Sequence, residues 1–453
     1  MTTIVKKNDF TEHIIGLQKI NINKKYRFSK YTVKYQYNKV TLLYNTMTQQ
    51  LIVLNDIETQ YISKYQTFNY CDAIKDLIQN WFLVDMEYDE KETYDQLITI
   101  IKATTHKDAI TSFVIYPTTD CNARCFYCFE LDRSRINMTQ KTAEDVCDYI
   151  ISVSKGYNIK LHWFGGEPLY NAAVINTICS RLSKVGINFK SYMVSNGYLF
   201  DDEMILQAKK NWNLKRVQIT LDGTEEVYNK TKAYIHKDSI SPFKKVYSNI
   251  KKLLDNDISI KVRLNMDMYN IENLYELVNK LKKDFGTYDK FKVYPAVLFE
   301  EIGADKIKRS DMQRNAVYDV FLELCEYLAQ NNLFKPAPLN NVIKINKCMA
   351  DNDSAVQILP NGKLGKCEHF TESEFIGSIY DNKTNYAVIQ SFKEKIDEIP
   401  YCKDCKLYPL CIELKKCKVD VPFGCMEGHR KEKMFRLIQR MKLTYDLWVK
   451  EQI

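Results

Sequence analysis

Three cysteines in one short run are the residues of this chain best suited to chemistry. Cys121, Cys125 and Cys128 form the pattern CxxxCxxC, and Tyr127 stands directly before the last of them. Thiolates are soft ligands that select iron–sulfur clusters, copper(I) or zinc. A cubane cluster normally takes four cysteines, so three on one loop would leave one iron open for a substrate or cofactor. The alternatives are a zinc loop or three buried cysteines, but zinc sites usually pair two CxxC-type units around one ion.

The run Cys-Asn-Ala-Arg-Cys-Phe-Tyr-Cys-Phe-Glu resembles the cluster loop of the radical S-adenosylmethionine (SAM) enzymes. The resemblance implies a [4Fe-4S] cluster held by Cys121, Cys125 and Cys128. Its open iron would chelate the amino and carboxylate groups of SAM. One electron from the cluster would then cleave SAM to a 5′-deoxyadenosyl radical, which abstracts a hydrogen atom. The protein's part in such chemistry is to bind and orient the cofactor.

Alternating strand-like and helical segments begin near residue 111 and would position this loop. Six such repeats predict an α/β fold in which a parallel sheet curls into a barrel or partial barrel; the resemblance implies a six-unit partial barrel, (β/α)6, and the count agrees with it. Active sites of barrel enzymes lie at the carboxyl ends of the strands, and the cysteine loop follows the first strand. The six strands are predicted at Phe113–Tyr116, Ile159–Phe164, Lys190–Val194, Arg216–Leu221, Ile258–Leu264 and Phe291–Val297.

A glycine-rich segment follows the second predicted strand. It reads Gly165, Gly166, Glu167 and Pro168, and its glycines allow the backbone to approach a ligand closely. The segment resembles the family motif that receives the amino group of the methionyl moiety. The alternative is a plain turn.

Polar residues after the next strands complete the expected cofactor site. Ser195 and Asn196 follow the third strand, and Asp222 follows the fourth. They resemble family segments near cofactor and substrate, although Asn-Gly and Asp-Gly also form ordinary turns. Asp222 is therefore a candidate substrate contact or proton acceptor. Arg263 is a candidate partner for the cofactor carboxylate, whose geometry a guanidinium matches; Lys232 stands near a position where the family often has arginine.

Seven further cysteines crowd the C-terminal part. They resemble the SPASM extension, which carries two auxiliary four-iron clusters, although five residues separate Cys411 from Cys417 where the family usually has three. The resemblance implies one cluster on Cys402, Cys405, Cys411 and Cys425 and another on Cys348, Cys367 and Cys417.

The second of these sets has only three ligands. We therefore hypothesise an open iron that binds a substrate thiolate, with a noncysteine ligand or water as the alternative. A zinc-ribbon site is a further alternative for the whole region. Glu368 directly follows Cys367, at a position where sulfatase-maturing relatives place an acidic base. Four remaining cysteines are expected to be buried small hydrophobic residues: Cys71, Cys147, Cys179 and Cys325.

The N-terminal part predicts a small strand-then-helix module. Strands are expected at residues 31–37, 40–44 and 51–54, and a helix around Ala73 to Phe82. The pattern resembles the leader-recognition elements of peptide-modifying enzymes, which bind peptide at a sheet edge; a plain structural extension is the alternative. The domains are predicted as 1–105 (peptide-recognition-like), 106–335 (radical SAM partial barrel) and 336–453 (SPASM-like, with a C-terminal helix).

Composition limits the partners and the compartment. An apolar fraction of 45% with 12% aromatic residues argues against disorder. The formal net charge is +8, with lysines scattered through the chain, so nucleic-acid binding is not expected. No signal peptide or membrane-spanning run is visible. We therefore expect a cytoplasmic protein without a membrane partner, and in that reducing compartment the fourteen cysteines favour metal ligands over disulfides.

These features together predict a radical SAM/SPASM maturase of a ribosomally made precursor peptide. It would install an intrapeptide cross-link, with thioether slightly favoured over carbon–carbon, and would use SAM and three [4Fe-4S] clusters. The partners would be a precursor peptide with its leader and a flavodoxin- or ferredoxin-type reductant. The alternatives are an anaerobic sulfatase-maturing enzyme that forms formylglycine and an iron–sulfur electron carrier.

Overall fold

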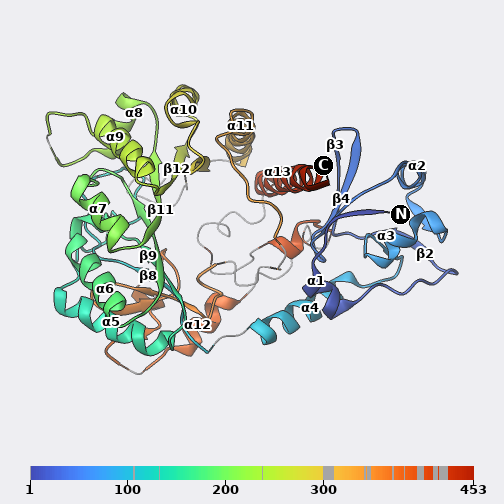
Figure 1. Cartoon of the computed structure of the whole chain (residues 1–453), viewed down its shortest axis with the longest axis horizontal. Coiled ribbons are helices and arrows are strands. Elements are labelled where there is room, and N and C mark those ends of the chain that lie inside the picture. The colour runs from blue at the N-terminus through green and yellow to red at the C-terminus, as the bar shows by residue number, and fades with distance from the viewer. Residues whose placement is uncertain are drawn as a thin grey trace.

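Figure 1 shows two parts side by side, a curved sheet covered by helices and an N-terminal part with the C-terminal helix α13 (Glu427–Gln452) against it. The computed structural model describes residues 2–105, 108–131, 133–236, 238–298, 311–340, 343, 348–369, 372–381, 383–394, 402, 404–411, 417 and 427–452. Within these residues, no helix is both long and apolar enough to cross a membrane.

Six parallel strands form the centre of the larger sheet. Their order is β13-β12-β11-β10-β9-β8, so each strand pairs with its neighbour in sequence. Every predicted strand is present, and the predicted α/β fold with a partial barrel is confirmed. The strands are β8 (Ser112–Ile115), β9 (Ile159–Trp163), β10 (Phe189–Ser195), β11 (Leu214–Leu221), β12 (Ser259–Met266) and β13 (Phe291–Val297).

Amphipathic helices cover the outer side of this sheet (Figure 1). On α9, for example, Val246, Ile250 and Leu253 are fully buried, because residues four and three apart share one helix face. They join the side chains that alternate strand residues send outward in one core. The helices are α5 (Gln140–Ser154), α6 (Ala172–Lys184), α7 (Asp202–Lys210), α8 (Glu225–Lys232), α9 (Pro242–Asp255), α10 (Ile271–Phe285) and α11 (Asp311–Gln330).

The sheet continues into the cysteine-rich part of the chain. β14 (Ala355–Ile358) pairs in parallel with β8, and β15 (Lys363–Gly365) and β16 (Gly377–Ser378) add antiparallel strands. The helix α12 (Tyr386–Lys393) follows. Segments on both sides of the predicted boundary at residue 335 therefore share one sheet, and the boundary itself stays a prediction.

The N-terminal part contains two antiparallel sheets. One has the order β1-β5-β4-β3 and the other β6-β2-β7. The predicted strands at 31–37, 40–44 and 51–54 correspond to β3, β4 and β5. The elements are β1 (Thr3–Lys6), α1 (Asp9–Ile15), β2 (Lys25–Phe28), β3 (Thr32–Tyr37), β4 (Val40–Asn45), β5 (Gln50–Val53), α2 (Asp56–Lys64), β6 (Thr67–Asn69), α3 (Lys75–Gln79), β7 (Leu83–Asp85) and α4 (Glu90–Thr105).

The helix predicted around Ala73 to Phe82 is shorter than expected. It begins as a 3-10 turn and continues as α3 only to Gln79. Trp81 has a φ of +66°, and the N–H of Phe82 donates to the Leu77 carbonyl at 2.9 Å. This is a Schellman-type ending, which stops a helix when one residue adopts the left-handed conformation.

Candidate active site

The cysteine loop docks on the glycine-rich segment through backbone contacts. The N–H of Glu167 donates to the Asp120 carbonyl at 2.9 Å, one residue before Cys121. A Cβ at Gly166 would lie 2.1 Å from the Asp120 oxygen. Gly165 has a φ of +112°, and a Cβ there would lie 2.3 Å from the Thr118 oxygen. Both glycines thus permit the segment to lie directly against the start of the loop.

The carboxylate of Glu167 is fully buried and binds the end of β10. It accepts hydrogen bonds from the Ser195 hydroxyl at 2.8 Å and from the backbone N–H groups of Asn196 at 2.7 Å and Leu169 at 3.2 Å. Burial raises the pKa of Glu167 to about 7, although these hydrogen bonds favour the charged form. Glu167 therefore holds together the segments after the second and third strands.

Asn196 also connects the third strand with the cysteine loop. Its amide Nδ2 donates to the Asn122 Oδ1 at 2.7 Å and lies 3.8 Å from the Cys121 sulfur. Asn122 is itself fully buried. The predicted residues Glu167, Ser195 and Asn196 are thus brought together beside Cys121.

A buried ion pair fixes the other side of the loop. The Lys232 Nζ lies 3.0 Å from the Asp222 Oδ2 and donates to the Tyr127 hydroxyl at 2.7 Å. The Tyr127 hydroxyl donates to the Asp222 Oδ1 at 2.8 Å. Burial alone would lower the pKa of Lys232, but Asp222 and Tyr127 raise it well above its usual range. Asp222 is therefore engaged by the cysteine loop and by Lys232.

Arg263 lies on the inner face of the barrel, opposite Thr220 in the neighbouring strand. Its Nε donates to the Asn265 Oδ1 at 2.8 Å. Proposed contacts of Arg263 and Pro168 with the cofactor stay predictions; Pro168 is buried at the start of the 3-10 turn (Pro168–Asn171) that Glu167 caps.

The three thiols of the cysteine loop suit a metal cluster whose positive charge favours their deprotonated form. Burial raises the pKa of Cys121 to about 12 and of Cys128 to about 11, and it also raises the pKa of Cys125. A bound metal deprotonates such thiols outright. Cys125 and Cys128 lie close enough to Cys121 to contribute to the shift of its pKa, so the three thiols gather in one place. Three cysteine donors on one loop fit an iron–sulfur cluster.

Cys348, Cys367 and Cys417 lie together in the C-terminal part. They pack against one small cluster formed by Ala350 and Phe392, and burial raises the pKa of Cys367 to about 12, with Cys348 and Cys417 close enough to contribute. The structure thus brings together the three cysteines that were assigned to one auxiliary cluster.

Arg133 joins this group of cysteines to the cysteine loop of Cys121, Cys125 and Cys128. Its guanidinium donates to the Glu368 carbonyl at 2.7 Å and pairs with Glu130 at 2.8 Å, and the Phe129 and His369 rings lie 4.2 Å apart. Burial raises the pKa of Glu130 to about 7 and also raises that of Glu368. Glu368 thus lies between the two cysteine groups.

Of the other predicted cluster ligands, Cys405 packs with Val33 and Leu42 of the N-terminal part. The N–H of Cys405 donates to the Cys402 carbonyl at 3.2 Å, and the Lys433 Nζ of α13 lies 3.1 Å from the Cys411 sulfur. Cys425 lies outside the described residues. Cys147, Cys179 and Cys325 are buried as expected, whereas Cys71 is only half-buried.

Sequence reasoning missed Asn122, Arg133 and Glu130 as parts of the site. Their only signal was position: Asn122 stands between two cysteines, and Glu130 and Arg133 follow the last one. Lys232 was noticed as a departure from the family arginine, but its pairing with Asp222 depends on how the loop folds back.

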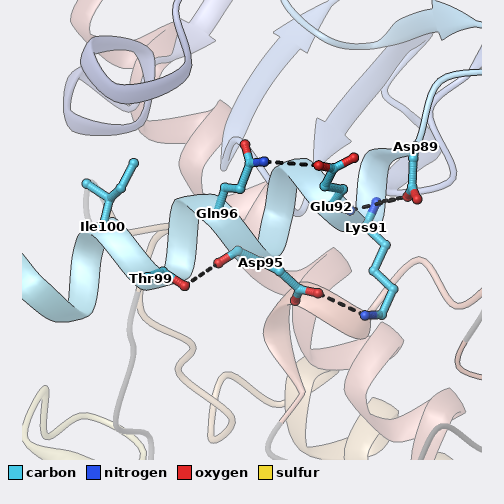
Figure 2. Close-up of a pocket in the computed structure, with 7 residues that line it drawn as sticks. All are labelled: Asp89, Lys91, Glu92, Asp95, Gln96, Thr99 and Ile100. Atoms are coloured by element: carbon cyan, nitrogen blue, oxygen red, sulfur yellow. Dashed lines mark hydrogen bonds and ion pairs between the residues drawn. The ribbon is translucent and has the colours of Figure 1, made fainter.

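A surface hollow in the N-terminal part is separate from these residues. Figure 2 shows that it follows one face of α4, where Lys91 pairs with Asp95 and Gln96 donates to Glu92. None of the predicted ligands lines it, so it is not part of the candidate active site.

Known proteins resemble this arrangement. A GTP 3′,8-cyclase of Clostridium perfringens (strain SM101 / Type A) is 23% identical over 268 residues, which cover 56% of this chain and 79% of that protein. The structure of native anSMEcpe with bound AdoMet matches with a TM-score of 0.55 at 16% identity, covering 74% of this chain and 99% of that one. Streptococcus suis SuiB bound to S-adenosylmethionine matches with a TM-score of 0.53 at 15% identity, covering 89% and 98%.

At these identities the structural matches concern the fold. The family itself is indicated by residues 115–282, which match the family model of the Radical SAM superfamily. This range begins within β8 and includes the cysteine loop, the glycine-rich segment, Asp222 and Arg263. The chain therefore carries a radical SAM domain over residues 115–282.

Proposed function

We propose that this enzyme matures a ribosomally made precursor peptide by installing an intrapeptide cross-link. The observation that carries the proposal is the position of Cys348, Cys367 and Cys417. This group is joined to the cysteine loop by Arg133 and by the contact between Phe129 and His369. A second metal centre beside the first supplies an electron acceptor for an oxidative reaction. The solved structure of SuiB with its precursor peptide SuiA supports a peptide substrate, because that fold covers 88% of this chain with a TM-score of 0.52.

The cofactors would be SAM and three [4Fe-4S] clusters. The first cluster would bind Cys121, Cys125 and Cys128, and together with SAM it would supply one-electron chemistry that ends in hydrogen abstraction. The residues proposed to orient the cofactor are Tyr127, Gly165, Gly166, Glu167, Pro168, Ser195, Asn196 and Arg263. Here the chain's contribution is positional, because the buried network of Glu167 and Asn196 fixes the loop relative to the strands.

A thioether is the favoured product. Its formation removes one hydrogen from a peptide carbon and one from a cysteine thiol, so the peptide loses two hydrogens and leaves one electron for an acceptor. The group of Cys348, Cys367 and Cys417 would accept that electron and, with only three cysteine ligands, would have an iron open for the substrate thiolate. Glu368 and Asp222 are the candidates for moving the proton. A carbon–carbon link is the alternative product.

The N-terminal part is proposed to bind the leader of the precursor. β3 is an edge strand of its sheet, and an extended peptide adds to such an edge through main-chain hydrogen bonds. A purely structural role for this part is the alternative. We place the enzyme in the cytoplasm with a flavodoxin- or ferredoxin-type reductant, because in a reducing compartment fourteen cysteines serve as metal ligands rather than as disulfides.

The test is an anaerobic assay with peptides made from the short open reading frames that neighbour this gene. The reconstituted enzyme should form 5′-deoxyadenosine and a product two hydrogens lighter, and fragmentation should locate a bond between two residues. The variant Cys125→Ala is the control and should do neither. Formylglycine, or no change in the peptide, would contradict the proposal; formylglycine would favour a sulfatase-maturing activity.

A further inference from the structure

The inner face of the barrel carries a set of cations. Alternate residues of β11, β12 and β13 pack outward against the helices, so the residues between them point into the barrel. Four of these are basic, and we call them the basic inner face: Arg216, Lys261, Arg263 and Lys292.

Aromatic rings and amides, rather than carboxylates, contact these cations. The Lys261 Nζ lies 4.1 Å from the centre of the Tyr294 ring, and the Arg216 guanidinium lies 5.1 Å from that of Tyr192. Arg263 binds an amide oxygen. In the part of the chain that the structure describes, no acidic residue forms an ion pair with any of the four. Cation–π contacts hold a positive charge without neutralising it.

The four cations also repel one another. Burial, together with the nearby charges of Arg216, Arg436, Lys292 and Arg263, lowers the pKa of Lys261 to about 8. Arg436 reaches this face from α13, where it is already paired with Glu432 at 2.9 Å. Lys261 and Arg263 are half-buried and Arg216 and Lys292 are exposed, and such a face of like charges attracts an anion.

The spacing of the cations suits an extended ligand. Arg216 lies opposite Ser259, and Lys261 lies two residues further along β12, opposite Lys292 of β13. At about 3.3 Å per residue this separation along the strand is about 7 Å, the spacing of alternate residues in an extended peptide. At the carboxyl end of β11 the basic inner face reaches Thr220, which is two residues before Asp222.

We propose that the basic inner face binds a run of acidic residues in the substrate peptide. This inference rests on the proposed peptide substrate and adds its chemistry. Acidic side chains would pair with Arg216, Lys261 and Lys292, which form no ion pair within the described residues, while Arg263 stays with the cofactor. The peptide would thereby be oriented below the cysteine loop.

The test uses two labelled decapeptides, one of alternating Glu and Ala and one with Gln in place of Glu. Their binding to the reconstituted full-length enzyme with SAM is measured by fluorescence anisotropy at low and high salt. The acidic peptide should bind about tenfold tighter at low salt, and this advantage should shrink as salt screens the charges. Equal binding of the two peptides by the wild-type enzyme would overturn the proposal without any variant.

Two matched double variants test whether the acidic peptide binds at the basic inner face. Lys261→Gln with Lys292→Gln should weaken the acidic peptide by about fivefold or more. Lys209→Gln with Lys210→Gln removes the same charge from the exposed end of α7 and should change the affinity less than about twofold. Equal losses in both variants would mean that only net charge matters, which also overturns the proposal.

A nucleotide is the competing occupant, because one relative is a GTP 3′,8-cyclase. If GTP displaces the acidic peptide and binds more tightly than it does, the face is a nucleotide site and the proposal fails. Formation of 5′-deoxyadenosine by the wild-type enzyme is measured separately. If the wild-type enzyme forms no 5′-deoxyadenosine, the proposed function is contradicted. If it forms 5′-deoxyadenosine but does not prefer the acidic peptide, only this inference is contradicted.

Discussion

At the residue scale, Lys232 neutralises a carboxylate that has no access to solvent. The side chains of Lys232 and Asp222 are 4% and 2% exposed. Removing one partner of such a pair leaves an uncompensated charge, so Lys232→Met should cost about 3–5 kcal/mol of the free energy of unfolding. Urea unfolding monitored by circular dichroism measures this loss.

An exposed pair provides the control. Lys251 pairs with Asp255 on α9, with side chains 62% and 43% exposed, and Lys251→Met should cost less than about 1 kcal/mol. Similar losses of unfolding free energy in the two variants would show that the buried pair stabilises the protein no more than an exposed pair does.

Glu167 should make stability depend on pH. Burial raises its pKa from 4.5 to about 7, so between these values the folded protein holds a proton that the unfolded chain has lost. Its contribution to stability therefore falls as the pH rises through this window. Relative to Glu167→Gln, the wild-type apoprotein should lose up to about 3 kcal/mol between pH 5 and pH 8. Unfolding titrations at both pH values test this, and parallel pH profiles would contradict it.

Gly166 should be irreplaceable for a purely local reason. A Cβ there would lie 2.1 Å from a backbone oxygen of the cysteine loop, whereas a Cβ at Gly156 meets nothing within 4 Å. Gly166→Ala should therefore displace the loop and lose about four irons, one cluster, whereas Gly156→Ala should keep them. Iron analysis of reconstituted protein distinguishes the two, and full iron in Gly166→Ala would refute the docking argument.

At the scale of elements, the strands of the barrel could be predicted because they are short apolar runs between helical repeats. The start of β11 at Leu214 and the end of α3 could not, because local hydrogen bonds and a left-handed Trp81 decide them. The same limit applies to the site. Cysteine spacing predicts which residues are candidate cluster ligands, but the partners of Asp222 and Glu368 depend on tertiary contacts between distant segments.

The helix α13 joins the C-terminus to the N-terminal sheet. Leu437 and Met441 pack with Val33 and Leu42 in one buried cluster, and Met441 is fully buried. Met441→Ala should cost about 2–5 kcal/mol because it leaves a cavity. Leu447→Ala on the same helix, where the side chain is 41% exposed, should cost about 0.5 kcal/mol or less. Thermal unfolding checks both, and equal shifts would contradict the packing.

At the scale of the whole molecule, the N-terminal part contacts the C-terminal segment that contains Cys405 and Cys411. The Thr46 hydroxyl donates to the Lys406 carbonyl at 2.6 Å, and the Tyr94 hydroxyl donates to the Pro409 carbonyl at 3.2 Å. These partners are more than 300 residues apart in sequence, and no local pattern could predict them. The proposed leader-binding part therefore rests directly on the segment that contains Cys405 and Cys411.

Tyr408 makes this connection testable. Its ring lies 6.5 Å from that of Tyr31 and 5.7 Å from that of Tyr94, so Tyr408→Ala removes the aromatic contact between the two parts. We expect it to lower the iron content by about one cluster, four irons, because the segment between Cys405 and Cys411 loses its support. Tyr386→Ala, where the side chain is 71% exposed, is the control and should retain all iron. If Tyr408→Ala also retains its iron, the N-terminal part does not support that metal site, and its contact with the segment serves only to hold the two parts together.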